Sequence, residues 1–250
     1  MPMKFIGIIP SRFASTRFPG KPIADICGKT VIRRVYEQSR KALETVVVAT
    51  DDDRIYDAVE AFGGKVVMTR SDHKCGTDRC LEAYQAITTP AWRAQNNKET
   101  VIINIQGDEP FIQPEQIEAL MACFERAETD IATLVRPFTN QDTQADLDDV
   151  NTPKVNWDTV SGEAKMFSRK VIAASDGQYY RHIGIYAYRA DVLEQITRLP
   201  QSPLEIAERL EQLRWLENGY TIRVGVTQIP TIGIDTPEDL AKAIEWYKRS

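Results

Sequence analysis

The chain lacks the glycine patterns that mark the two commonest nucleotide-binding loops. Neither the Walker A pattern G-x-x-x-x-G-K-[S/T] nor the dinucleotide fingerprint G-x-G-x-x-G occurs in its 250 residues. Their absence argues against a P-loop nucleotide site and against a nicotinamide-dependent dehydrogenase. Cysteine is also scarce: the nearest pair, Cys75 and Cys80, is too widely spaced for a C-x-x-C motif. Four cysteines in a chain this long are no disulfide framework, so we expect buried or idle thiols.

Long apolar runs and a basic charge excess are missing as well. No run approaches the roughly 20 apolar residues that span a bilayer, and residues 1–10 lack the cleavage site of a signal peptide. We therefore expect a cytoplasmic protein without membrane insertion. The net charge is −5, which disfavours nucleic acid as a partner because nucleic-acid-binding surfaces are usually strongly basic. The remaining composition, 42% hydrophobic and 27% charged, is that of an ordinary globular protein.

Short apolar runs alternate with helical segments in the first half of the chain. The runs cover residues 4–9, 45–50, 65–69, 100–105 and 130–135, and the helical segments cover 31–42, 54–62, 77–87 and 114–127. This rhythm predicts an α/β fold, Rossmann-like, with a mostly parallel sheet and helices on both faces. Ligands of such sheets bind at the carboxyl ends of the strands.

The rhythm changes after about residue 136. Strands at 154–157, 164–168 and 181–189 are expected to form a smaller antiparallel excursion, about 137–190, within a single domain of residues 1–250. A helix over 202–218 follows, with Ser202 and Glu205 as a capping box. A strand at 220–226 and a helix at 236–248 complete the chain, whereas residues 92–99 read as a surface loop.

A basic loop, residues 10–22, follows the first predicted strand. Residues 1–24 contain Lys4, Arg12, Arg17 and Lys21 and no acidic residue, although the whole chain is acidic. Arginine forks match phosphate oxygens and lysine adds a point charge, so the loop at this sheet edge is a candidate polyphosphate site. A solvated basic loop is the alternative.

Two acidic positions are candidate Mg²⁺ ligands. Asp108 directly follows the apolar run 100–105, so its carboxylate should project at the same sheet edge as the basic loop. A carboxylate beside a triphosphate is tolerated when a hard cation lies between them. Asp235 precedes the predicted helix N-cap, Thr236, and its position fits a second ligand and a part of the cap equally well.

Seven motifs in order give the chain a family resemblance. They are S-R-x-x-S-T-R-x-P-G-K-P, ATDDD, MTRSDHKCGTDR, NIQGDEP, RHIGIYAYR, SPLE with LEQLR, and GIDTPEDL. Together they resemble the 3-deoxy-manno-octulosonate cytidylyltransferases, or CMP-Kdo synthetases. The resemblance implies a nucleotide-diphospho-sugar transferase fold, a homodimer and a Mg²⁺ requirement. It also implies transfer of a cytidylyl group from CTP to the anomeric hydroxyl of Kdo, with release of pyrophosphate, for lipopolysaccharide synthesis.

The resemblance assigns roles to individual residues. Arg12, Lys21, Asp108 and Asp235 would be catalytic, with the two aspartates holding Mg²⁺. The nucleotide would be bound by Arg12, Arg17, Lys21, Arg70, Gly76, Thr77 and Gln106, and the sugar by Arg169, His182, Tyr186, Glu211 and Gln212. Read without the family, His182 is more often a core histidine, Tyr186 a core aromatic, and Glu211 with Gln212 a helix face.

Several alternatives stay open at this point. The family pattern implies a longer segment than this chain has at residues 170–180, which leaves another acidic sugar, of the sialic acid type, as a rival acceptor. A non-catalytic nucleotide-binding protein is a rival of another class. His182 is a candidate general base, although Mg²⁺ is favoured for activating the hydroxyl. Trp157, Phe167 and Ile172 form either a dimer interface or the core of the antiparallel excursion.

Overall fold

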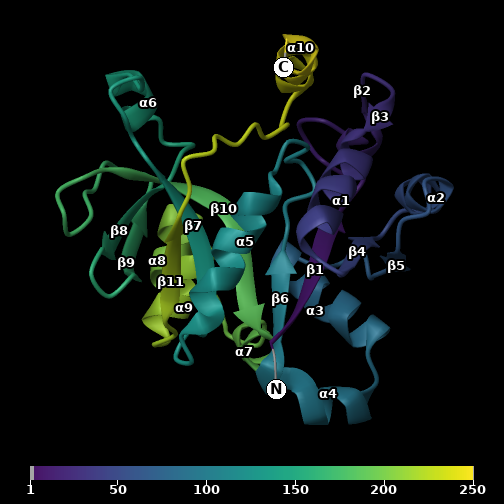
Figure 1. Ribbon diagram of the computed structural model, residues 1–250, viewed down its shortest axis with the longest axis horizontal. Coiled ribbons are helices and arrows are strands. Elements are labelled where there is room, and N and C mark those ends of the chain that lie inside the picture. Colours follow the sequence, from purple (N-terminus) through teal and green to yellow (C-terminus); the bar gives the residue numbers. More distant parts are fainter. Residues whose placement is uncertain (1–2, 250) are drawn as a thin grey trace. The chain divides into compact units, whose positions relative to one another are not determined.

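The computed structural model describes residues 3–249, which divide into two compact units (Figure 1). The first unit comprises residues 3–117 and 231–249, and the second comprises 118–230. Helix α5 (Pro114–Ala122) carries the chain from the first unit into the second. No helix among the described residues is both long and apolar enough to cross a membrane.

A four-stranded parallel sheet forms the centre of the first unit. Its order is β5 (Val66–Met68), β4 (Thr45–Thr50), β1 (Lys4–Ser11) and β6 (Thr100–Asn104). Successive strand residues point to opposite faces, and the five residues from Val46 to Thr50 are all buried. Both faces of β4 are therefore covered, which explains why this strand is a continuous apolar run in the sequence. The prediction of these four strands as a parallel sheet is confirmed.

Helices and a small hairpin complete the first unit. The helices are α1 (Val31–Ala42), α2 (Asp53–Ala61), α3 (Gly76–Ile87), α4 (Pro90–Asn96) and α10 (Pro237–Arg249), with 3₁₀ turns η1 (Lys21–Ile23) and η2 (Asn97–Glu99) and hairpin strands β2 (Asp25–Ile26) and β3 (Lys29–Thr30). The surface loop predicted at 92–99 is wrong. Thr89 caps α4 by accepting a hydrogen bond from Trp92 N (3.2 Å), and Pro90 occupies the first turn. Seven residues are too few to show a helical period in the sequence.

The second unit contains a five-stranded mixed sheet. Its order is β10 (Tyr180–Arg189), β7 (Ile131–Pro137), β11 (Ile222–Val226), β9 (Glu163–Ser168) and β8 (Lys154–Asp158). Strands β7 and β11 are parallel, and the other pairs are antiparallel. Strand β8, at one end of this order, also pairs with β10, at the other end. Residues 130–135, assigned above to the parallel sheet, thus form a strand that is antiparallel to β10.

The helices of the second unit differ from the prediction, which had no helix at 144–148 or at 190–196. They are η3 (Cys123–Glu125), α6 (Gln144–Asp148), α7 (Ala190–Ile196), α8 (Pro203–Glu208) and α9 (Gln212–Glu217). The capping box of Ser202 and Glu205 is confirmed. The single helix predicted over 202–218 is wrong, because Arg209 adopts a left-handed conformation (φ 54°) and ends α8. The helical period runs on past this break, so the sequence does not reveal it.

Trp157 and Phe167 are buried within the second unit, with 6% and 0% of their surface exposed. Phe167 also contacts the ring of His182, with 5.2 Å between ring centroids. These two aromatics therefore belong to the core of the unit, as the second of the two interpretations held.

Candidate active site

A cavity of about 290 Å³ lies in the first unit where β1 and β6 end. Its walls come from four segments that are far apart in the sequence: the basic loop, the start of α3, the turn after β6 and the segment before α10. Residues that line it include Ser11, Arg12, Arg17, Lys21, Gly76, Arg79, Gln106, Asp108 and Asp235. The predicted site at the carboxyl edge of this sheet is therefore present as a cavity.

The basic loop folds back on itself before it reaches the cavity. Gly20 N and Ser15 N both donate to the carbonyl oxygen of Phe13, at 3.0 and 2.9 Å. Gly20 has a positive φ of 75° and packs against the Phe13 ring, where a Cβ would be 3.1 Å from the nearest ring atom. Glycine meets both requirements. The turn sets Lys21 at the start of η1, with its side chain only 12% exposed.

Gly107 lets the turn after β6 approach the end of β1. A Cβ at this position would be 2.5 Å from Ser11 Oγ and 2.9 Å from the carbonyl oxygen of Pro10. Only glycine fits so close to another backbone. The approach brings the next residue, Asp108, to the cavity wall.

Asp108 and Asp235 converge on one cation. Lys21 Nζ lies 2.6 Å from Asp108 Oδ2 and 3.2 Å from Asp235 Oδ1. Arg17 Nη2 lies 3.0 Å from Asp235 Oδ2, although both of these side chains are at least half exposed. The predicted convergence of the two aspartates with the cations of the basic loop is therefore observed.

The cap of α10 is made by residues other than Asp235. Asp239 Oδ2 accepts hydrogen bonds from the backbone N–H groups of Asp235 (3.1 Å) and Thr236 (3.0 Å), and Thr236 Oγ1 accepts from Asp239 N (3.2 Å). The carboxylate of Asp235 is thus available to face Lys21. Its backbone is tied to the turn after β6, because Ile234 N donates to the carbonyl oxygen of Asp108 (2.9 Å).

A small hydrophobic cluster connects the three charged segments. Ile234 and Phe111 are buried in it together with residues of the hairpin and α10, and Phe18 of the basic loop packs against it. Each of these three residues lies within three positions of Asp235, Asp108 or Lys21 in the sequence. One cluster therefore anchors all three segments of the cavity wall.

The donor set at this position fits a hard divalent cation. Two carboxylate oxygens already contact a single positive group, and Mg²⁺ typically takes one or two carboxylates and completes its shell with phosphate oxygens and water. Within residues 3–249 no group of three or more His, Cys, Asp and Glu side chains forms a metal site. Two aspartates alone would leave most of the Mg²⁺ coordination shell to water and to oxygens of a substrate.

Glu109 places a partly buried acid beside Asp108. Burial, followed by the negative charge of Asp108, raises the pKa of the Glu109 carboxyl to about 7. Sequence reasoning did not single this residue out, although it lies in the same motif as Asp108.

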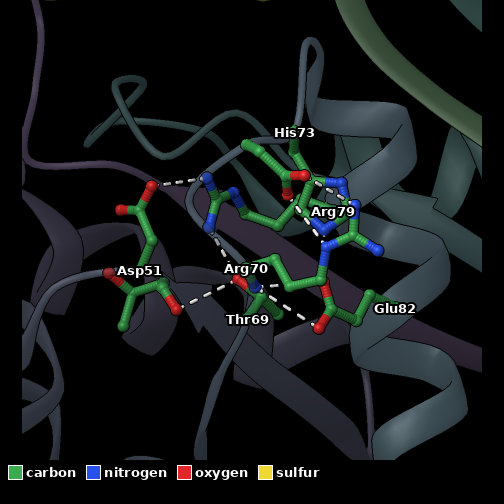
Figure 2. Close-up of polar contacts among 8 residues, drawn as sticks. Asp51, Thr69, Arg70, His73, Arg79 and Glu82 are labelled. Atoms are coloured by element: carbon green, nitrogen blue, oxygen red, sulfur yellow. Dashed lines mark hydrogen bonds and ion pairs between the residues drawn. The ribbon is translucent and has the colours of Figure 1, made fainter.

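A polar network supports the wall that leads into α3 (Figure 2). Arg79 is 4% exposed and donates to Asp51 Oδ2 (2.8 Å) and Thr69 Oγ1 (2.6 Å). His73 forms a short hydrogen bond with Glu82, whose carboxylate also accepts from Arg70 N (3.1 Å). Burial raises the pKa of Glu82, but hydrogen bonds from His73 and Arg70 N outweigh it and the net pKa is lowered. Arg79 and His73 both line the cavity, and sequence reasoning gave no role to Arg79.

The residues predicted to bind the nucleotide do not all reach the cavity. Gly76 and Gln106 line it, together with Arg12, Arg17 and Lys21. Thr77 is buried in the first turn of α3. Arg70 is largely exposed and paired with Asp72 through two contacts of 2.8 Å. Contact of Thr77 and Arg70 with a nucleotide stays a prediction.

An orphaned polar atom lies in the cavity wall. Ser11 Oγ is buried and has no hydrogen-bond partner among the described residues, and the same holds for Asn104 Oδ1 near the end of β6. Burying a hydroxyl without a partner is costly. Ser11 Oγ is therefore free to form a hydrogen bond with a polar ligand in this cavity.

The predicted sugar-binding residues lie in the second unit. His182 and Tyr186 are neighbours on β10, with 5.3 Å between their ring centroids, and Glu211 and Gln212 lie at the start of α9. Burial, with a smaller contribution from Glu211, raises the pKa of Tyr186 well above its ordinary value. Gln212 Nε2 and Trp215 Nε1 are buried donors without a partner among the described residues. Unpaired donors beside these side chains suit a hydroxyl-rich ligand.

Two of these residues have contacts that bear on their predicted roles. Burial lowers the pKa of the His182 imidazole to about 3, and its Nε2 lies 2.9 Å from Thr133 Oγ1. A base this weak takes up protons poorly near neutral pH. The Arg169 guanidinium donates to the carbonyl oxygens of Glu208 and Val150, both at 2.8 Å. Its contact with a sugar carboxylate stays a prediction.

Known proteins resemble this chain in sequence and in fold. The cytidylyltransferase family profile matches residues 6–223. The 3-deoxy-manno-octulosonate cytidylyltransferases of Parabacteroides distasonis and Phocaeicola vulgatus are each 57% identical to the chain. The alignments cover 97% of both proteins for the first, and 99% of this chain and 98% of the relative for the second. A solved structure of CMP:2-keto-3-deoxy-manno-octonic acid synthetase complexed with CTP superposes with a TM-score of 0.87 at 38% identity, covering 98% of this chain and 99% of that one.

Proposed function

Since this chain belongs to the family of 3-deoxy-manno-octulosonate cytidylyltransferases, we propose that it transfers a cytidylyl group from CTP to Kdo. The products are CMP-Kdo and pyrophosphate, and CMP-Kdo serves lipopolysaccharide synthesis. The observation that carries the proposal is the cavity in which Lys21 meets both Asp108 and Asp235 beside Arg12 and Arg17. The positive side chains neutralise the charge of a triphosphate. The two aspartates would repel the triphosphate unless a divalent cation lay between them.

The first unit binds the triphosphate of CTP in this proposal. Arg12 and Lys21 contact the β- and γ-phosphates, with Arg17 close by, and Ser11 Oγ and the backbone at Gly76 offer further polar contacts. The anomeric hydroxyl of the sugar loses its proton to solvent and its oxygen attacks the α-phosphorus, as the bond from this phosphorus to the oxygen shared with the β-phosphate breaks. Negative charge then grows on the departing pyrophosphate, where positive side chains stabilise it.

Asp108 and Asp235 are the residues that would hold Mg²⁺. When bound there with the nucleotide, Mg²⁺ supplies neutralisation of phosphate charge and lowers the pKa of the attacking hydroxyl. His182 is a poor candidate for the same task because of its low pKa. We therefore assign His182, Tyr186, Glu211, Gln212 and Arg169 to sugar binding in the second unit, not to proton transfer.

A pyrophosphate-release assay tests the proposal. The protein is incubated with CTP and Mg²⁺ and with either Kdo, a nine-carbon sialic acid or no acceptor. We expect pyrophosphate only with Kdo. Release solely with the sialic acid would make the rival sugar the substrate, and CTP binding without release for any acceptor would indicate a nucleotide-binding protein without catalysis.

We also propose a cytoplasmic homodimer, as the family resemblance implies. Light scattering at micromolar concentration should give twice the 28.3 kDa of one chain. The mass of a monomer would refute the dimer and leave the catalytic proposal unaffected.

A further inference from the structure

Lys21 fills the position that the proposed function gives to a divalent cation. Its ammonium group contacts both Asp108 (2.6 Å) and Asp235 (3.2 Å), and it is largely shielded from water. Among these contacts the shorter one involves the less exposed aspartate, which is 31% exposed against 50% for Asp235. One side-chain cation thus satisfies both carboxylates.

Lys21 and a divalent cation cannot contact these two aspartates at the same time. Mg²⁺ sits about 2.0–2.1 Å from its oxygen ligands. An ammonium 2.6 Å from the same carboxylate would then lie within a few ångström of a doubly charged ion, where repulsion is strong. Divalent cation binding therefore requires Lys21 to leave.

The same cavity gives Lys21 another anion to bind. Lys21 lines the cavity with Arg12 and Arg17, which is the surface proposed above for the triphosphate. Lysine is flexible and carries three donors, so its ammonium group can exchange a carboxylate for a phosphate oxygen by side-chain rotation. A triphosphate would both attract Lys21 and add ligands for the cation.

We propose that Lys21 makes divalent-cation binding depend on nucleotide binding. Without a nucleotide, its ammonium group holds Asp108 and Asp235 together and competes with the cation; with a nucleotide, it moves to the phosphates and the aspartates become available. By thermodynamic linkage, each ligand then strengthens the binding of the other. The inference rests on the proposed function, because that function supplies the triphosphate.

A Mn²⁺ titration of the full chain without nucleotide tests this competition. Free Mn²⁺ is measured by electron paramagnetic resonance for the wild type, Lys21→Met and Lys29→Met. Lys29 is a matched control because its Nζ also lies 2.6 Å from a carboxylate, that of Glu37, and it does not line the cavity. We expect Lys21→Met to bind Mn²⁺ about tenfold more tightly than the wild type, a change of roughly 1.4 kcal/mol. Lys29→Met should stay within about twofold.

Equal or weaker Mn²⁺ binding by Lys21→Met would overturn the inference. Addition of Asp235→Asn to Lys21→Met should remove the gain, and persistence of the gain would also contradict the assigned position. If Lys21→Met does not fold, the ¹⁵Nζ resonance of Lys21 in the wild type decides. It should shift when CTP is added in the presence of a chelator, and an unchanged resonance would refute the exchange of partners.

The outcomes separate this inference from the proposed function. Pyrophosphate release by the wild type together with unchanged Mn²⁺ affinity in Lys21→Met would refute only the role of Lys21. Tighter Mn²⁺ binding in Lys21→Met without pyrophosphate release from the wild type would refute the proposed reaction and support the competition.

Discussion

The substitution Gly107→Ala should disturb the site through a single methyl group. The added Cβ would lie 2.5 Å from Ser11 Oγ and 2.9 Å from the carbonyl oxygen of Pro10. Pro10 belongs to β1, which is paired with β4 on one side and β6 on the other, so its carbonyl group cannot retreat cheaply. The turn that carries Asp108 must therefore move instead.

The size of the effect follows from these distances. Ordinary van der Waals contact begins near 3.4 Å, so the Cβ must move about 0.5 Å away from the Pro10 carbonyl oxygen, and about 0.9 Å away from Ser11 Oγ if that hydroxyl keeps its rotamer. A misplacement of about 1 Å in a catalytic group can cost on the order of 10²-fold in rate. Overpacking of this kind also costs about 1–3 kcal/mol of stability. We expect kcat/KM to fall roughly 10- to 100-fold, with a measurable drop in melting temperature.

Gly233→Ala is the matched control for this experiment. Gly233 lies two residues before Asp235, and no atom outside its immediate neighbours lies within 4 Å of the Cβ position. Steady-state pyrophosphate release and thermal unfolding are measured for both variants. Near-normal activity in Gly107→Ala, or an equal loss in Gly233→Ala, would refute the argument that close packing at Gly107 places Asp108.

Three further predictions follow from other residues. Asp235→Asn should lower kcat about 100-fold or more, with the exposed Glu238→Gln as control; a normal rate at saturating Mg²⁺ would exclude Asp235 as a ligand. Because the pKa of Glu109 is higher in the folded protein than in the unfolded chain, its protonated carboxyl contributes to the free energy of unfolding below about pH 4.5. This contribution is lost as the pH rises through 7. The loss reaches about 3 kcal/mol. In metal-free protein, urea unfolding should therefore show Glu109→Gln to be more stable than the wild type at pH 8 and similar to it at pH 4. Equal stability of the two proteins at pH 8 would contradict this. Arg209→Gly should relieve the left-handed strain at φ 54° and gain about 1 kcal/mol over Arg209→Ala; no difference between the two variants would show that the strain is absent.

The sequence was sufficient to predict a feature where a single structure is compatible with the residue pattern. Strands buried on both faces need apolar residues at nearly every position, so β1, β4 and β6 were recognisable from their composition. The meeting of Asp108 with the basic loop followed from the geometry of parallel sheets, since loops at the carboxyl ends share one edge.

Other features could not be predicted because two structures satisfy the same pattern. Strand β7 is buried on both faces whether its neighbour is parallel or antiparallel, so its composition does not reveal its pairing with β10. Asp235 could have been a cap or a ligand until Asp239 was seen to take the cap. Arg79 becomes identifiable as part of the wall only when its partners, Asp51 and Thr69, are in place.

The central claim concerns the chemistry that the aspartate pair and the basic loop perform together. Phosphorus NMR of the protein with CTP, Kdo and Mg²⁺ tests it most directly, because each product has its own resonances. We predict that the three signals of CTP are replaced by a phosphodiester signal and a pyrophosphate signal of twice its area. Unchanged CTP, or release of inorganic phosphate without a phosphodiester, would contradict the account.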